Sequence, residues 1–226
     1  MCPISLDAFT ALGVVNVSKS ERIGLQILID GESLNAYEIW RRSEYKHYPT
    51  ILRAVKKLNK KGLINEIAHD DARKTIYYTI NFGGQIYYYL ISNNSDKANQ
   101  NLINKSLRFR ELSDGFLMHN WGSRIRRKIY EKIIAYEIEG SEYNINSEIE
   151  KILGLIINDY ITDIINDITN EYVSFDVEEL QNIINYSKKF RWIYNITENI
   201  IQNGIKYSDK LNMAYRKTNA MLESNL

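Results

Sequence analysis

The feature that most restricts the fold of this chain is a helical pattern followed at once by a strand–turn–strand pattern, in residues 47–80. Apolar side chains recur there at helical spacing, at Ile51, Ala54, Val55 and Leu58. This spacing predicts a helix with one buried face. Pro49 suits the first turn of that helix, and Gly62 is typical of the C′ position that ends one.

Two short stretches of strand composition follow this helix. Leu63, Ile64 and Ile67 begin the first, and Thr75–Ile80 form the second, which is rich in β-branched and aromatic residues. The polar run His69–Ala72 predicts the turn between them, and Arg73 and Lys74 lie at the tip. The pattern therefore predicts a helix that leads directly into an antiparallel hairpin with a basic tip.

Shorter elements are expected on both sides of this pair. Ser18 or Ser20 is typical of the N-cap of a helix over about 19–30, and Ser33-Leu34 can form a short strand. Asn35 can cap a helix that runs to about Arg42, and a fourth helix is expected over 82–91.

The polar stretch Ser92–Asn101 is the best candidate for a domain boundary, which divides the chain into residues 1–92 and 93–226. It is either a linker or the polar start of a long helix. Beyond it the pattern is helical: residues 123–139, a helix to about Tyr172 opened by a Ser147–Glu150 capping box, a helix from Asp176 to about Asn203, and a last helix from Ser208. The apolar stripe of residues 147–172 fits the core of a bundle or the seam of a coiled-coil dimer.

Charge is strongly segregated along the chain, although the net charge is only +1. Residues 41–61 contain eight basic side chains and one acidic side chain, Glu44, whereas residues 137–179 contain twelve acidic side chains and one basic side chain, Lys151. A basic patch beside an acidic body can orient a molecule on a polyanion, while a charge run taken alone is often a solvated helix face. The basic run of residues 124–128 can be interpreted in either way. It is a second nucleic-acid contact, or it is a solvated helix face that pairs with the acidic helices.

Basic and polar side chains lie opposite the apolar stripe of the helix that Gly62 ends, at Lys46, Thr50, Arg53 and Lys57. Arginine and lysine can donate hydrogen bonds to guanine edges or to phosphates, and threonine can contact a base or the backbone. Lys56, Lys60 and Lys61 lie further along, where phosphate or solvent is the expected neighbour. Arg73 and Lys74 would add contacts to the DNA backbone or minor groove.

The run from Pro49 to Ile64 resembles the recognition helix and following strand of winged-helix regulators, and residues 73–83 resemble the second wing strand and helix start of PadR- and MarR-type proteins. The resemblance covers residues 18–92. It implies a winged helix–turn–helix, with Lys46, Thr50, Arg53 and Lys57 facing the groove and Arg73 and Lys74 in the wing. Such families are usually dimeric transcription regulators, but the roughly 130 C-terminal residues here exceed their usual single dimerisation helix.

No pattern for catalysis, a cofactor or a metal is found in the sequence. It lacks a Walker loop, a nucleophile elbow, an HExxH motif and a spaced cysteine pair, and Cys2 is the only cysteine. A signal-peptide pattern and a long apolar run are also missing, so a cytoplasmic protein that does not cross a membrane is expected.

The sequence therefore predicts a mainly α protein with a small β-hairpin wing: an N-terminal winged helix–turn–helix and a C-terminal all-helical domain. We expect a homodimeric, sequence-specific transcription regulator of double-stranded DNA, dimerised through its C-terminal helices, with a small-molecule effector left open. The alternative is a winged-helix adaptor subunit of a transcription, replication or partition complex. The expected DNA-binding residues are Lys46, His47, Thr50, Arg53, Lys56, Lys57, Arg73 and Lys74.

Overall fold

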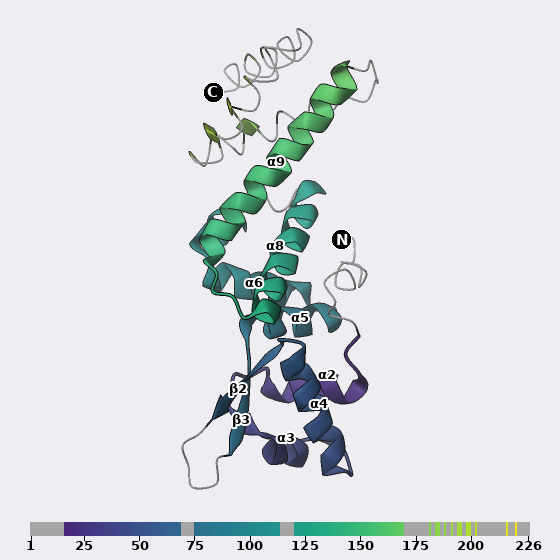
Figure 1. Ribbon diagram of the computed structural model, residues 1–226. Coiled ribbons are helices and arrows are strands. Elements are labelled where there is room, and N and C mark those ends of the chain that lie inside the picture. The colour runs from purple at the N-terminus through teal and green to yellow at the C-terminus, as the bar shows by residue number, and fades with distance from the viewer. Residues whose placement is uncertain are drawn as a thin grey trace. The chain divides into compact units, whose positions relative to one another are not determined.

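The computed structural model describes residues 16–68, 75–113 and 120–169, with isolated residues between 181 and 220 (Figure 1). The elements in chain order are α2 (Lys19–Leu28), β1 (Leu34–Asn35), α3 (Ala36–Arg42), α4 (Tyr48–Lys60), β2 (Ile64–Ala68), β3 (Ile76–Ile80), α5 (Phe82–Ile91), α6 (Ser95–Lys105), α7 (Leu107–Ser113), α8 (Asn120–Glu139) and α9 (Ile145–Thr169). The described chain is thus mostly helical with one small antiparallel sheet, in agreement with the predicted fold class at this level.

The first two helices start at matching capping boxes. The Ser18 hydroxyl accepts from the Glu21 backbone N–H, and the Glu21 carboxylate accepts from the Ser18 backbone N–H. Asn35 and Glu38 repeat this exchange at the start of α3. Each box satisfies two backbone donors that a helix start otherwise leaves unpaired. Ser18 and Asn35 were both predicted as caps, whereas their glutamate partners were not.

The sheet has the strand order β1-β3-β2, with both pairings antiparallel. Leu34 of β1 lies opposite Tyr78, and Ile64 of β2 lies opposite Ile80. β3 is therefore the central strand and β2 an edge strand. Ile64, Tyr78 and Ile80 are buried, so one face of the sheet covers the core.

One hydrophobic core joins the sheet to α2, α3, α4, α5 and α8. Its buried members are Leu25, Leu28, Leu34, Ala36, Ile39, Ile51, Val55, Leu58, Leu63, Ile64, Tyr78, Ile80, Tyr87 and Ile134. The predicted apolar stripe of α4 is part of it. Ile134 belongs to α8, so a helix far along the chain completes the core of the N-terminal elements.

Two glycines allow the C-terminal turn of α8 to approach closely. A Cβ atom on Gly62 would lie 2.4 Å from the Ile138 Cα, and one on Gly83 would lie 2.6 Å from the Glu137 Cγ. Gly62 also has φ +64°, the left-handed conformation that glycine adopts at little cost. α8 is therefore packed directly on the turn after α4 and on the start of α5.

The chain divides into two compact units, residues 1–148 and 149–226. The boundary predicted at residue 92 lies inside the first unit, because α5 to α8 belong to it. The assignment of separate functions to residues 1–92 and 93–226 stays a prediction. In the second unit, α9 buries Ile149, Ile152, Leu153, Ile156 and Ile157.

One detail of the helical part corrects the sequence prediction, and another decides between two alternatives. The Ser147–Glu150 pair does not open α9: this helix starts at Ile145, and the Asn144 side chain accepts from the Ser147 N–H at 3.2 Å. Of the two alternatives for the polar stretch after residue 92, the structure shows the start of a helix, but this helix, α6, is short and is capped by Asn94. The helices predicted after Asp176 and Ser208 lie outside the described residues.

Candidate nucleic-acid interface

The exposed side of α4 carries four basic side chains. Arg53, Lys56, Lys57 and Lys60 are all exposed, and we call this group the α4 cationic face. Because successive residues turn by about 100°, these four fall within roughly 100° of arc, opposite the buried stripe. Within the described part of the chain, these four side chains form no ion pair or hydrogen bond. The face is therefore four uncompensated positive charges on a helix whose other side is fixed in the core.

The other predicted DNA-binding residues have different placements. Lys46 and His47 are exposed immediately before α4, and His47 is its N-cap residue without a capping hydrogen bond from its side chain. Thr50 is half-buried beside the exposed face of α4, so its side chain is less accessible to DNA than predicted. Arg73 and Lys74 lie outside the described residues.

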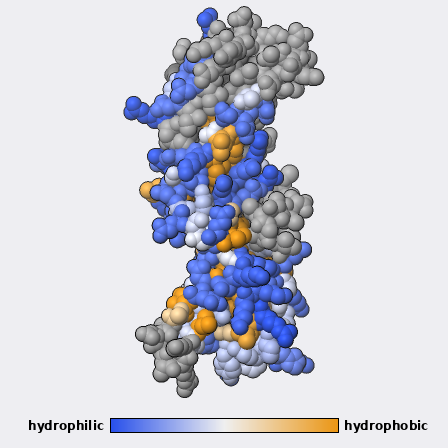
Figure 2. Space-filling view, in the orientation of Figure 1, coloured by the Kyte–Doolittle hydropathy of each residue, from blue (hydrophilic) through white to orange (hydrophobic). Residues whose placement is uncertain are grey.

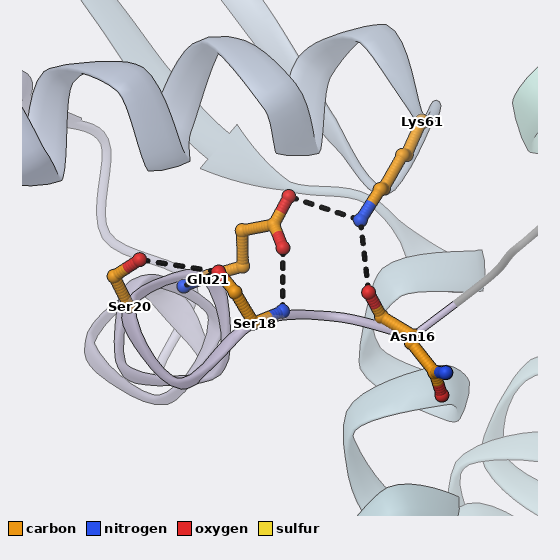
Figure 3. Close-up of polar contacts among 5 residues, drawn as sticks. All are labelled: Asn16, Ser18, Ser20, Glu21 and Lys61. Atoms are coloured by element: carbon orange, nitrogen blue, oxygen red, sulfur yellow. Dashed lines mark hydrogen bonds and ion pairs between the residues drawn. The ribbon is translucent and has the colours of Figure 1, made fainter.

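Lys61 differs from its neighbours, and its expected role was wrong. Its Nζ donates to Glu21 Oε1 at 2.9 Å and to the Asn16 carbonyl at 3.4 Å (Figure 3). The Glu21 side chain is only 3% exposed, so this contact neutralises a buried carboxylate. Lys61 is therefore occupied inside the protein rather than facing phosphate or solvent.

The pKa of Glu21 reflects this contact. Burial alone would raise it, but hydrogen bonds from Ser18 and Lys61, together with the charge of Lys61, lower the pKa below the ordinary value of 4.5. The carboxylate is consequently held in its charged form, and the pair ties the start of α2 to the end of α4.

Hydrogen bonds and aromatic packing fix the turn that leads into α4. The Trp40 indole N–H donates to the Tyr45 carbonyl at 2.8 Å, and the Ser43 hydroxyl donates to the Trp40 carbonyl at 2.8 Å. The rings of Tyr37, Trp40 and Tyr48 pack with centroid separations of 5.4 to 6.3 Å, and we call them the aromatic triad. The triad packs two side chains of α3 against Tyr48, the first residue of α4. Sequence reasoning missed it, although the i,i+3 spacing of Tyr37 and Trp40 signals a shared helix face.

Two side chains of the basic run on α8, Arg127 and Lys128, pair with a carboxylate of the same helix. Arg127 lies 3.4 Å from Glu131, and Lys128 lies 3.9 Å from the same carboxylate. Arg124 and Lys128 are exposed. This pairing favours the solvated-face interpretation over a second nucleic-acid contact, and the partner of Arg127 and Lys128 is on α8 itself.

The described residues contain no group of three or more His, Cys, Asp or Glu side chains placed to hold a metal ion. No helix among them is both long and apolar enough to span a membrane.

Comparison with known proteins finds no match: no family model, curated protein or solved structure matches this chain. A functional conclusion therefore has to come from the residues themselves. The α4 cationic face is the strongest feature available, since it combines exposure, uncompensated charge and a rigid support.

Proposed function

We propose that residues 18–92 form a winged helix–turn–helix that binds double-stranded DNA, and that the chain is a sequence-specific transcription regulator. In this proposal α4 is the recognition helix and the β2–β3 hairpin is the wing. The observation that carries it is the α4 cationic face, Arg53, Lys56, Lys57 and Lys60, exposed and without intramolecular partners in the described chain. The element order α2–β1–α3–α4–β2–β3 supports the same assignment.

The dimensions and charge of α4 suit the major groove of B-DNA. The groove is about 12 Å wide and admits one α-helix, with basic side chains reaching base edges and phosphates. Arg53 lies near the middle of the exposed arc and Lys57 lies one turn further along at its edge, and these two are the proposed base readers. Lys56 and Lys60 are the proposed phosphate contacts, which release counterions and make binding weaken with salt.

A homodimer completes the proposed regulator. Two copies joined through their C-terminal helices would present two α4 helices to half-sites about 34 Å apart, one turn of DNA. The C-terminal helices are proposed as the joining region; the isoleucines of α9 are already buried within the single chain, so a dimer would use its exposed side. An inverted repeat is the operator expected from such a pair.

One observation favours the alternative, a winged-helix adaptor in a transcription, replication or partition complex. Ile67 of β2 and Ile76 of β3 are 37% and 45% exposed, and Figure 2 shows apolar surface over the hairpin. Exposed apolar side chains next to an edge strand suit contact with another protein.

The test is selection of genomic fragments by the purified full-length protein at two salt concentrations. We expect enrichment of a short inverted repeat, with affinity that falls as salt rises. The double variant Arg53→Ala, Lys57→Ala should lose roughly 10²- to 10⁴-fold in operator affinity, because each base contact contributes about 1–3 kcal/mol. Its melting temperature should stay close to that of the wild type, because both side chains are exposed.

The matched control removes two exposed charges elsewhere, in Arg110→Ala, Lys132→Ala on α7 and α8. It should keep operator affinity within a few-fold of the wild type. Unchanged binding by the α4 double variant would exclude α4 as the recognition helix. Weak, sequence-blind retention of DNA by the wild type would instead favour the adaptor.

A further inference from the structure

Tyr37 combines exposure with tight aromatic support. Its side chain is 53% exposed, yet its ring lies 5.4 Å from that of Trp40 and 6.3 Å from that of Tyr48. Trp40 in turn packs edge-on against Tyr48 at 6.0 Å and is anchored to the Tyr45 carbonyl. Tyr37 is therefore a surface side chain whose position is fixed by its neighbours.

The position of Tyr37 is the start of α3, beside the first residue of α4. Tyr48 is that first residue, and the exposed Lys46 and His47 come directly before it. The Asn35–Glu38 capping box already pairs backbone N–H groups at the start of α3. The Tyr37 hydroxyl therefore has no capping role there. Within the described residues this hydroxyl makes no hydrogen bond.

We propose that the Tyr37 hydroxyl donates a hydrogen bond to a backbone phosphate of duplex DNA, next to a phosphate contact by Lys46, at the end of the interface where α4 begins. This inference rests on the proposed function and adds a contact from α3 to it. Tyrosine hydroxyls are among the groups that contact DNA phosphates, and in helix–turn–helix proteins the first helix of the motif crosses the backbone. A ring that is already fixed loses little conformational entropy on binding.

The chemistry of Tyr37 favours a phosphate over a base as its partner. The residue lies on α3 and not on the exposed arc of α4, so it is outside the part of the interface that enters the groove. Bases in a duplex are also stacked on one another and leave no ring face for tyrosine to stack on. A contact to phosphate fixes position but carries no sequence information.

The experiment measures the affinity of full-length variants for two duplexes, the selected operator and a scrambled duplex of equal composition, over a range of salt. Tyr37→Phe removes only the hydroxyl and keeps the aromatic triad. We expect it to weaken both duplexes by the same factor, roughly 10- to 100-fold, the loss of one hydrogen bond to a charged group. The slope of log affinity against log salt should stay unchanged, because a neutral phenol displaces no counterion.

Lys46→Ala and Arg53→Ala are the comparison variants. Lys46→Ala should weaken both duplexes and reduce the salt slope by about one, while Arg53→Ala should weaken mainly the operator. The melting temperature of Tyr37→Phe should equal that of the wild type, which separates a DNA contact from a structural role.

Three results would overturn the inference. Wild-type affinity of Tyr37→Phe for both duplexes would remove the proposed contact while the proposed function stood. A loss confined to the operator would make Tyr37 a base reader instead of a phosphate contact. Absence of salt-dependent binding by the wild type would overturn the proposed function, and this inference with it.

Discussion

Adjacent lysines at the end of α4 have opposite surroundings. Lys60 is exposed on the α4 cationic face, whereas Lys61 is bonded to the buried Glu21. A side chain that is removed from a buried pair leaves its partner charged and unpaired, which costs more than the pair itself contributes. Identical substitutions at the two positions should therefore have different effects.

Lys61→Ala should destabilise the protein, by somewhat less than the roughly 3–5 kcal/mol typical of a fully buried pair, because the Lys61 side chain is 24% exposed. Lys60→Ala should change stability by no more than about 0.5 kcal/mol. Urea unfolding of both variants measures these differences. Under the proposed function, Lys60→Ala is the one that reduces the salt slope of DNA binding. Equal stability of the two variants would mean that the Glu21–Lys61 contact contributes nothing.

Two carboxylates in the first unit have pKa values shifted in opposite directions. The pKa of Glu21 is lowered, so its contribution to stability is present above its unfolded value and is lost as pH falls through the folded value. The pKa of Glu137 is raised, chiefly by burial and in spite of hydrogen bonds from Tyr143 and the Gly83 N–H and the charge of Lys105. Its contribution is therefore largest when it is protonated, and it is lost as pH rises through the folded value.

Glu137→Gln should stabilise the protein at neutral pH, because an amide avoids the burial of a charge and still accepts hydrogen bonds. The gain over wild type should shrink as pH falls below the ordinary glutamate value of 4.5. Glu21→Gln is the matched variant with the opposite sign: it should destabilise at neutral pH, and its deficit should shrink in acid. Thermal unfolding across this pH range measures both. A destabilised Glu137→Gln at neutral pH would show that the Lys105 and hydrogen-bond contributions exceed the cost of burial.

At the scale of elements, the turn between α4 and β2 depends on glycine for two reasons at once. Gly62 has a left-handed φ of +64° and lies against the backbone of α8. Gly31 provides a comparison, since its φ is +82° and an added Cβ would meet nothing within 4 Å. Substitutions at the two positions separate the energetic cost of a left-handed backbone from the cost of a steric clash with α8.

Gly31→Ala should cost only the left-handed strain, roughly 1–2 kcal/mol. Gly62→Ala should cost that amount plus roughly 1–3 kcal/mol for the displacement of α8. Denaturant unfolding of the two variants gives the comparison. Similar losses would indicate that α8 moves away from the turn without cost.

Elements governed by local signals were predictable from the sequence. The bounds of α5, Phe82–Ile91, agree with the expectation, and the α4 stripe ends at Gly62 as predicted. These features depend on caps, glycines and periodicity that lie within a few residues of one another. The start of α9 shows the limit of such signals, since Asn144 and Ser147 are both good caps and only the fold selects Asn144.

Features that join distant parts of the chain were not predictable. The contact of Lys61 with Glu21 spans 40 residues, and the approach of α8 to Gly62 spans more than 70. Periodicity marks a residue as buried or exposed but does not name its partner. For the candidate interface, the sequence identified Arg53, Lys56 and Lys57. That Lys61 is excluded from this interface, and that aromatic neighbours support Tyr37, could be learned only from the three-dimensional arrangement.

At the scale of the whole molecule, the sequence and the packing suggest different divisions. Polar residues 92–101 predict a boundary there, but Ile134 of α8 is fully buried in the same core as α2 and α4. If this core is one cooperative unit, the DNA-binding elements of the proposal cannot fold independently of α8. That coupling would link any signal that reaches α8 to the orientation of α4.

Ile134→Ala distinguishes the two divisions. It should destabilise the protein by about 2–5 kcal/mol, the usual cost of a large-to-small core substitution. Because the core is shared, native-state hydrogen exchange should show lost protection in α2 and α4 as well as in α8. Leu155→Ala, at a side chain that is 64% exposed in the second unit, is the control and should leave exchange in α2 and α4 unchanged. Loss of protection confined to α8 would instead mean that residues 1–92 fold by themselves, as the polar stretch predicts. In that case α8 packs on a core that forms without it.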